Sequence, residues 1–107
     1  MPVIRIEYDD SIVSDDQAHA LAVATQREVS EETGIKDVFV YGNASRIRVG
    51  VAPIEIWVEV TASKISSPDE TLASLRQRLG GWKTTADFPH PINLTLNLMN
   101  WKFAIGI

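Results

Sequence analysis

Residues Pro2-Val3-Ile4-Arg5-Ile6-Glu7 and Pro53-Ile54-Glu55-Ile56-Trp57-Val58-Glu59 are two similar stretches that decide the fold. In both, apolar and polar side chains alternate, which is the period of a strand with one buried face. Each is followed by a serine-capped, acid-rich helix start, at Ser14 and at Ser67. Because order and spacing repeat together, the sequence predicts two βαβ pseudo-repeats, about 2–49 and 53–98. Chance similarity among alternating strands is the alternative.

The rest of the pattern completes this α/β (α+β) fold. Further strands are expected at 38–41 and 92–98, and shorter extended pieces at 45–49 and in the tail that carries Trp101, Phe103 and Ile105. The first helix should end at Gly34, and Gly80-Gly81 leave the end of the second open. We therefore expect a mixed four-stranded sheet plus short edge strands, with both helices on one face.

Composition predicts one globular domain over residues 1–107. Apolar residues make up 45% of the chain and charged residues 22%, which argues against disorder. A monomer of this size closes its core only partly, so self-association is expected. The absence of cysteine removes disulfides and thiolate chemistry.

Several classes of partner are disfavoured by the sequence. The net charge of -4 comes without a basic block, so nucleic-acid binding is not expected. Neither a signal peptide nor a membrane span follows Met1, so we expect no membrane partner and a cytoplasmic protein. His19 and His90 lack nearby ligand-like residues, and no phosphate-binding loop is present, so no metal or cofactor is expected. Small molecules and other protein chains are the expected partners.

Pro2 is the first candidate catalytic residue. Removal of Met1 would leave a secondary amine fixed at the start of a strand. Apolar neighbours and nearby guanidinium groups lower the pKa of such an amine toward neutrality, which suits a general acid or base. Many proteins begin with Met-Pro without any such role, and a retained Met1 would turn the Pro2 nitrogen into an amide without basicity.

Arg46 and Arg48 are the second candidates. At a spacing of two on a strand, both side chains would project from one face and could hold a carboxylate or a developing enolate oxygen. A solvated strand edge is the alternative reading of the same pair.

The opening Met-Pro-Val-Ile-Arg-Ile-Glu-Tyr, the doubled βαβ pattern and the length resemble the tautomerase superfamily. The chain is most similar to the 5-carboxymethyl-2-hydroxymuconate isomerase group of that superfamily. Residues 44–49, Ala-Ser-Arg-Ile-Arg-Val, look like its arginine-bearing strand, and residues 92–97, Ile-Asn-Leu-Thr-Leu-Asn, like its last main strand. The shorter length and the Gly80-Gly81 pair depart from that group.

The resemblance implies a homotrimer with pockets between subunits and an isomerase that moves a proton in a small 2-oxo or 2-hydroxy-enoate acid. Pro2 would be the acid/base catalyst, Arg46 or Arg48 would bind the acid, and Lys36, Ala62 and Ser63 match pocket positions more loosely. Three alternatives stay open: a decarboxylase or hydratase that keeps Pro2 protonated, a non-catalytic trimeric binding module, and an unrelated α+β dimer.

Overall fold

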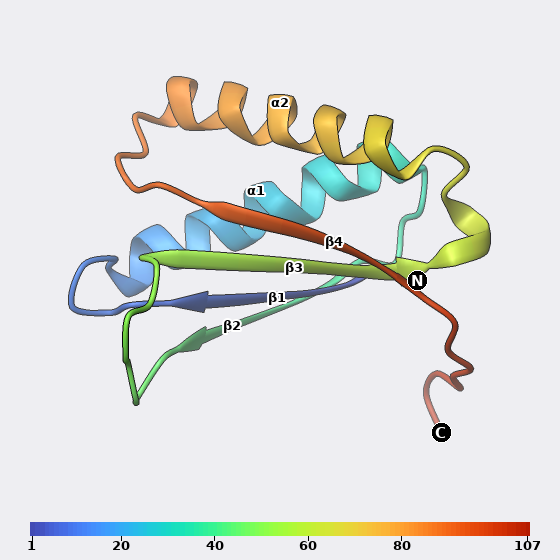
Figure 1. Ribbon diagram of the computed structural model, residues 1–107, viewed down its shortest axis with the longest axis horizontal. Coiled ribbons are helices and arrows are strands. Elements are labelled where there is room, and N and C mark those ends of the chain that lie inside the picture. The colour runs from blue at the N-terminus through green and yellow to red at the C-terminus, as the bar shows by residue number, and fades with distance from the viewer.

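Four strands form one mixed sheet, and two helices cover one of its faces (Figure 1). The computed structural model describes residues 1–107. In chain order the elements are β1 (Val3–Tyr8), α1 (Asp15–Thr33), β2 (Phe39–Ala44), β3 (Ile54–Thr61), the short 3₁₀ helix η1 (Ala62–Lys64), α2 (Pro68–Ala86) and β4 (Asn93–Met99). The expected mixed four-stranded sheet with two helices on one face is confirmed.

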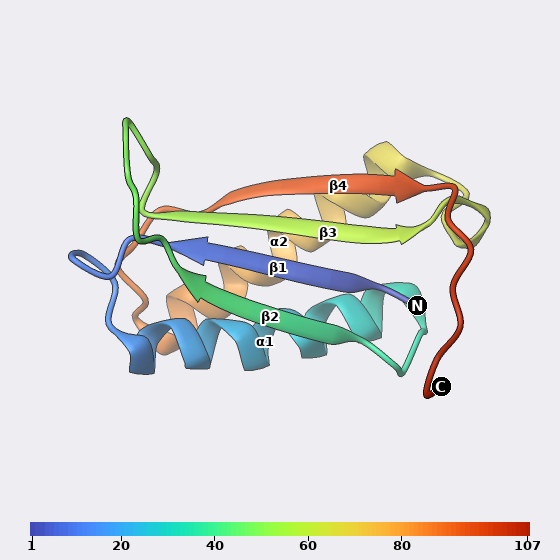
Figure 2. The same ribbon diagram turned by 90° about the horizontal axis from the view of Figure 1, so that it is seen from below.

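The strand order is β2-β1-β3-β4, seen from the open side in Figure 2. β1 pairs parallel with β2, β3 pairs parallel with β4, and the two central strands run antiparallel to each other. Each half of the chain thus forms a strand, a helix and a parallel strand, as the expected βαβ pattern requires. That the halves arose by duplication stays a prediction.

The core lies between the sheet and the helices. Alternate residues of the central strands, such as Ile4 and Ile56, point toward the helices and are fully buried. They pack with Leu21 of α1 and Leu75 of α2. Burial of an aliphatic side chain of this size contributes about 1.5–3 kcal/mol, so this alternation is what holds the two layers together.

Both ends of α1 follow the sequence signals. The Ser14 hydroxyl accepts a hydrogen bond from the backbone N–H of Gln17, whose side-chain oxygen accepts one from Ser14 N–H, at 3.1 and 3.0 Å. Gly34 ends the helix in the left-handed region with φ 72°, a conformation that glycine adopts without a steric penalty.

The second helix continues through Gly80-Gly81. It begins at Pro68, as expected, but the Ser67 side chain makes no capping hydrogen bond. It ends at Ala86, where Asp87 takes a left-handed conformation. Leu75 and Leu79 bury one face of α2, and this packing outweighs the cost of about 1 kcal/mol that each interior glycine adds. The possible stop at the glycine pair is therefore not used.

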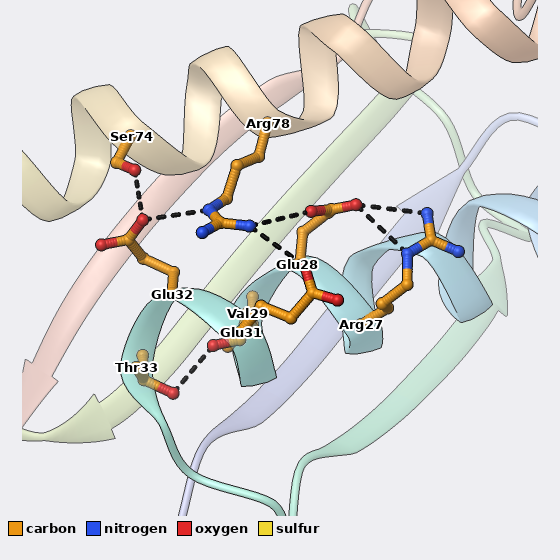
Figure 3. Close-up of polar contacts among 8 residues, drawn as sticks. All are labelled: Arg27, Glu28, Val29, Glu31, Glu32, Thr33, Ser74 and Arg78. Carbon is orange, nitrogen blue, oxygen red and sulfur yellow. Dashed lines mark hydrogen bonds and ion pairs between the residues drawn. The ribbon is translucent and has the colours of Figure 1, made fainter.

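A polar cluster joins the two helices on their outer side (Figure 3). The guanidinium of Arg78 on α2 lies 3.1 Å from Glu32 Oε1, 3.3 Å from Glu28 Oε1 and 3.1 Å from Glu31 Oε2, all on α1. The Ser74 hydroxyl also donates to Glu32. Hydrogen bonds to Glu32 and then Glu28 raise the pKa of Arg78 above its usual value, against an opposing effect of desolvation. Neither helix is long and apolar enough to cross a membrane.

Two expected extended pieces do not form strands. Residues 45–49 form a bent loop. The last hydrogen bond to β1 is the one that Ser45 N–H donates to the Tyr8 carbonyl. Because β1 ends at Tyr8, the residues after Ser45 have no neighbouring strand with which to pair. The tail after Met99 has no regular structure and pairs with no strand. The short edge strands of the expected fold are therefore wrong for the single chain.

The second face of the sheet carries no helix. Three rows cross it in register: Phe39, Val3, Glu59 and Asn97; Tyr41, Arg5, Trp57 and Thr95; Asn43, Glu7, Glu55 and Asn93. We call these twelve residues the open face. An ion pair of 2.5 Å between Arg5 and Glu59 lies in it. The polar stripe of β4 that the sequence left unplaced belongs to this surface.

Candidate active site

Pro2 lies at the start of the central strand β1 and is fully buried. Its carbonyl accepts a hydrogen bond of 3.1 Å from Phe39 N–H at the start of β2. In the antiparallel pair Val3 faces Glu59, so the end of β3 runs beside Pro2. The residue is thus held on both sides of its strand, and a nitrogen freed by loss of Met1 would emerge from a buried, ordered position.

The loops that hold Lys36, Ala62 and Ser63 lie at this same end of the sheet. Lys36 belongs to the connection between α1 and β2, and Ala62 and Ser63 to the 3₁₀ turn that follows β3. Lys36 is exposed and has no ion-pair partner. An unpaired ammonium near Pro2 would favour a negatively charged ligand there.

The C-terminal tail also reaches this end (Figure 2). The indole N–H of Trp101 donates a hydrogen bond of 2.9 Å to the Thr61 hydroxyl at the end of β3. Phe103 packs edge-on against Trp101 with ring centres 5.8 Å apart. Neither Trp101 nor Thr61 was a sequence candidate for the site. The alternating Trp101 and Phe103 of the tail were the only sequence signal for Trp101.

Arg46 and Arg48 lie at the opposite end of β1 from Pro2. Tyr8, the last residue of β1, pairs with Ala44, and both arginines follow Ala44 in the loop. Six strand residues separate the two ends, a span of about 20 Å at 3.3 Å per residue. The expectation that both project from one strand face is wrong, because the loop has no strand partner. Within one chain, Pro2 and these arginines do not form one site.

The two arginines differ in their contacts. Arg48 lies 2.6 Å from Asp10 Oδ1 and 3.3 Å from Asp9 Oδ1, and it donates to the Ser45 carbonyl at 3.0 Å. The hydrogen bond that the Ser11 hydroxyl donates lowers the pKa of Asp9, and the positive charge of Arg48 lowers it further. Arg46 is exposed and makes no hydrogen bond or ion pair. Arg46 is thus the arginine whose guanidinium is free for a ligand.

A buried phenol lies at the same end as the arginines. Tyr8 donates a hydrogen bond of 2.7 Å to Asp15 Oδ1, which ties the end of β1 to the first turn of α1. That bond, together with burial and the charge of Asp15, raises the pKa of Tyr8 to about 12. The phenol therefore stays protonated at neutral pH and acts as a structural donor.

The cavities of the single chain do not coincide with Pro2. A groove of about 580 Å³ lies between α2 and β4, where Leu72, Arg76 and Ile92 are among its lining residues. Pro2 lines none of the five main cavities. No group of three His, Cys, Asp or Glu side chains is placed to hold a metal ion. None of the main cavities of one copy is therefore the site of Pro2.

Solved structures with this arrangement define the class of fold. A fused 4-OT wild-type protein described as a symmetric trimer matches with a TM-score of 0.70 and 15% identity, covering 98% of this chain and 94% of its own. A macrophage migration inhibitory factor-like protein from Entamoeba histolytica matches with a TM-score of 0.66 and 17% identity, covering 96% and 95%. A malonate semialdehyde decarboxylase matches with a TM-score of 0.67 and 20% identity, covering 98% and 91%.

These matches run over nearly the whole chain, so the protein has the fold of the tautomerase superfamily. The fold that the sequence resemblance implied is confirmed. No protein-family model and no curated protein matches the sequence. The likeness to the 5-carboxymethyl-2-hydroxymuconate isomerase group stays a prediction.

Proposed function

We propose that this protein is an isomerase that moves a proton within a small 2-oxo or 2-hydroxy-enoate acid, with the amino-terminal Pro2 as acid and base. The observation that carries the proposal is the position of Pro2. It is fully buried at the start of the central strand and directly follows Met1 in the sequence. A fold shared with a fused 4-OT protein and with a malonate semialdehyde decarboxylase supports it.

The proton transfer needs a free secondary amine. Once Met1 is removed, the Pro2 nitrogen takes the proton of the enol hydroxyl and, as an ammonium, returns it to a carbon of the same molecule, so that no proton is gained or lost overall. Burial of the amine would disfavour its charged form and bring its pKa toward neutral pH, where a proton can be both taken and given.

We further propose that the working form is a homotrimer in which a neighbouring copy completes the site. Pro2 and Arg46 lie about 20 Å apart in one chain, too far for one small acid. A guanidinium from another copy would instead hold the carboxylate through two parallel hydrogen bonds. Arg46 is the candidate for this role, with Lys36, Ala62 and Ser63 around Pro2. The fused 4-OT neighbour described as a symmetric trimer supports this arrangement.

The test begins with intact-mass spectrometry of untagged protein, followed on the same sample by ketonisation of 2-hydroxymuconate and phenylenolpyruvate. We expect loss of Met1 and measurable ketonisation. Pro2→Ala should lower kcat/KM by about 10²–10⁴-fold, because it removes the tuned secondary amine. Pro53→Ala is the matched control, since Pro53 begins the corresponding strand of the second half, and it should retain activity.

Near-normal turnover in Pro2→Ala would end the proposed mechanism. A retained Met1 in protein from its native source, together with absent ketonisation, would instead favour a non-catalytic module that uses the fold to bind a ligand or a partner.

The malonate semialdehyde decarboxylase among the structural neighbours favours a second candidate, decarboxylation or hydration of a related acid. That chemistry needs Pro2 protonated, whereas the isomerase needs it free. The pH profile of kcat/KM separates the two, because activity rises with pH through the pKa of Pro2 for a base and falls for an acid.

A further inference from the structure

The beginning of α1 and the end of α2 lie at the end of the molecule away from the amino terminus (Figure 1), and residues of both helix ends line a small pocket. Its volume is about 250 Å³. Residues from both helices and from the turn after α2 line it, and we call it the helix-end pocket: Asp16, Ala20, Trp82, Asp87, Phe88 and Pro89. Core packing accounts for Trp82 and Phe88, but neither the fold nor the proposed chemistry at Pro2 uses the carboxylate of Asp87.

Two aromatic residues give the helix-end pocket rigid walls. The rings of Trp82 and Phe88 have centres 5.1 Å apart and are inclined by 42°. Phe88 is 8% exposed, and His90 packs against it edge-on at 5.4 Å. His90 Nε2 is in turn 2.9 Å from the side-chain oxygen of Gln17, the residue of the α1 capping box. The aromatic side is thus fixed before any ligand arrives.

Two carboxylates at the same pocket have no partner. Neither Asp16 nor Asp87 makes a side-chain hydrogen bond or an ion pair, and both are exposed. Asp16 suits the first turn of α1, where a negative charge is favourable.

Asp87 has no such explanation. It ends α2 with φ 53° and ψ 45°, where glycine or asparagine is usual, and its backbone N–H alone makes the capping bonds to Lys83 and Thr84. Lys83, one turn earlier, lines a different cavity between α2 and β4. The charge of Asp87 therefore serves neither the helix end nor an ion pair.

We propose that the helix-end pocket binds a small quaternary ammonium ion. Aromatic rings attract an organic cation through their electron-rich faces, and methylated ammonium groups are weakly enough hydrated to leave water for such a site. The carboxylates of Asp16 and Asp87 complement the positive charge, and the net charge of -4 favours approach of a cation. The volume suits a head group and little more, since ligand pockets for larger molecules span about 300–1,000 Å³.

The test is a titration of the full chain with choline chloride, followed by the NMR signal of the Trp82 indole N–H, assigned by its loss in Trp82→Phe. The matched ligand control is 3,3-dimethyl-1-butanol, which has the shape of choline and no charge. We expect saturable shifts at millimolar choline and roughly 5–10-fold weaker binding of the alcohol. Equal binding of the two ligands, or no saturable shift with choline, would overturn the proposal.

Variants place the binding at this pocket. Asp16→Asn combined with Asp87→Asn should weaken choline binding by about 5-fold or more, and asparagine keeps the left-handed conformation at position 87. Asp69→Asn is the matched control, since Asp69 lies in the first turn of α2 and lines another cavity. Unchanged affinity in the double variant, with a spectrum that is otherwise that of the parent, would show that the carboxylates are not the ligands.

Discussion

Arg46 and Arg48, which one residue separates, make different contacts in this structure, and the difference bears on function. Arg48 is held by Asp9 and Asp10, whereas Arg46 extends without a partner. If a neighbouring copy supplies the guanidinium that binds the acid, the free side chain is the one available. Alternation along the chain could not separate them, because the distinction depends on carboxylates 36–39 residues earlier, at the turn after β1.

Arg46→Met should therefore lower kcat/KM for an acid substrate by about 10–100-fold, the loss of a charge-assisted hydrogen bond worth about 1.5–3 kcal/mol. Arg48→Met is the matched control and should change kcat/KM much less, because its guanidinium already serves Asp9 and Asp10. Steady-state kinetics on both variants checks this. The reverse order of effects would transfer the anchoring role to Arg48.

Tyr8 gives a prediction about alkaline pH. The phenol has a pKa of about 12 in the folded protein and 10.0 in its ordinary state. The unfolded chain therefore loses this proton first, so the stabilisation is fully present below about pH 10 and is lost as pH rises toward 12. Tyr8→Phe should lower the free energy of unfolding by about 1 kcal/mol at neutral pH. Between about pH 10 and 12 the variant should then lose less stability than the parent.

Urea unfolding from pH 7 to 12 measures this effect. Tyr41→Phe is the control, because the phenol of Tyr41 is exposed and makes no hydrogen bond. If Tyr8→Phe and the parent lost stability in parallel above pH 10, the bond to Asp15 would not be the cause.

At the scale of elements, the glycine pair in α2 is a direct test of where the helix ends. Gly80 and Gly81 are exposed and helical, and a Cβ at either position would meet open space. Gly80→Ala and Gly81→Ala should each stabilise the protein by about 0.5–1 kcal/mol, because alanine loses less conformational freedom in a helix.

Gly34→Ala is the opposite control. Gly34 has φ 72°, where a side chain is strained, so the same substitution should destabilise the protein. Chemical denaturation of the three variants gives the comparison. Destabilisation by alanine at position 80 or 81 would mean that the helix stops at the glycines.

The elements that could be predicted from the sequence are those whose signals are local. The capping box at Ser14, the glycine at position 34 and the alternation in β1 and β3 act within a few residues, and each appears where it was expected. Residues 45–49 alternate equally well, yet they lack a neighbouring strand and form a loop. A strand needs a partner that its own pattern does not reveal.

The same limit applies to the candidate site. Lys36, Ala62 and Ser63 fall near Pro2 because short connections keep them at the strand ends. The placement of the arginines depends on the direction and register of β1 and β2, which paired positions such as Tyr8 and Ala44 establish only once the chain is folded. Contacts between copies are harder still to predict from the sequence, because the pattern within one chain does not specify them.

At the scale of the whole molecule, the open face of the sheet is the surface that most needs a partner. Helices cover one side, and the other exposes Phe39 and Tyr41, 38% and 57% accessible, beside Trp57. Antiparallel strands tolerate water on one face, but aromatic residues in adjacent rows are more typical of contact with another chain. Arg5 on this face is paired with the buried Glu59, whereas Glu7 and Glu55 lie opposite each other without a basic partner.

Trp57→Lys should therefore reduce the proposed trimer to monomers, because it replaces an aromatic residue of the open face by a charge opposite Arg5. Light scattering after size exclusion should give the mass of three chains, each 11.9 kDa, for the parent and of one chain for the variant. Val23→Lys is the matched control, since Val23 is 50% exposed on α1 and should leave the mass unchanged. Trp57→Lys should lose activity together with the trimer, because the proposed site needs Arg46 from a neighbouring copy. Val23→Lys should keep both. An active monomer would show that Pro2 works without a second chain.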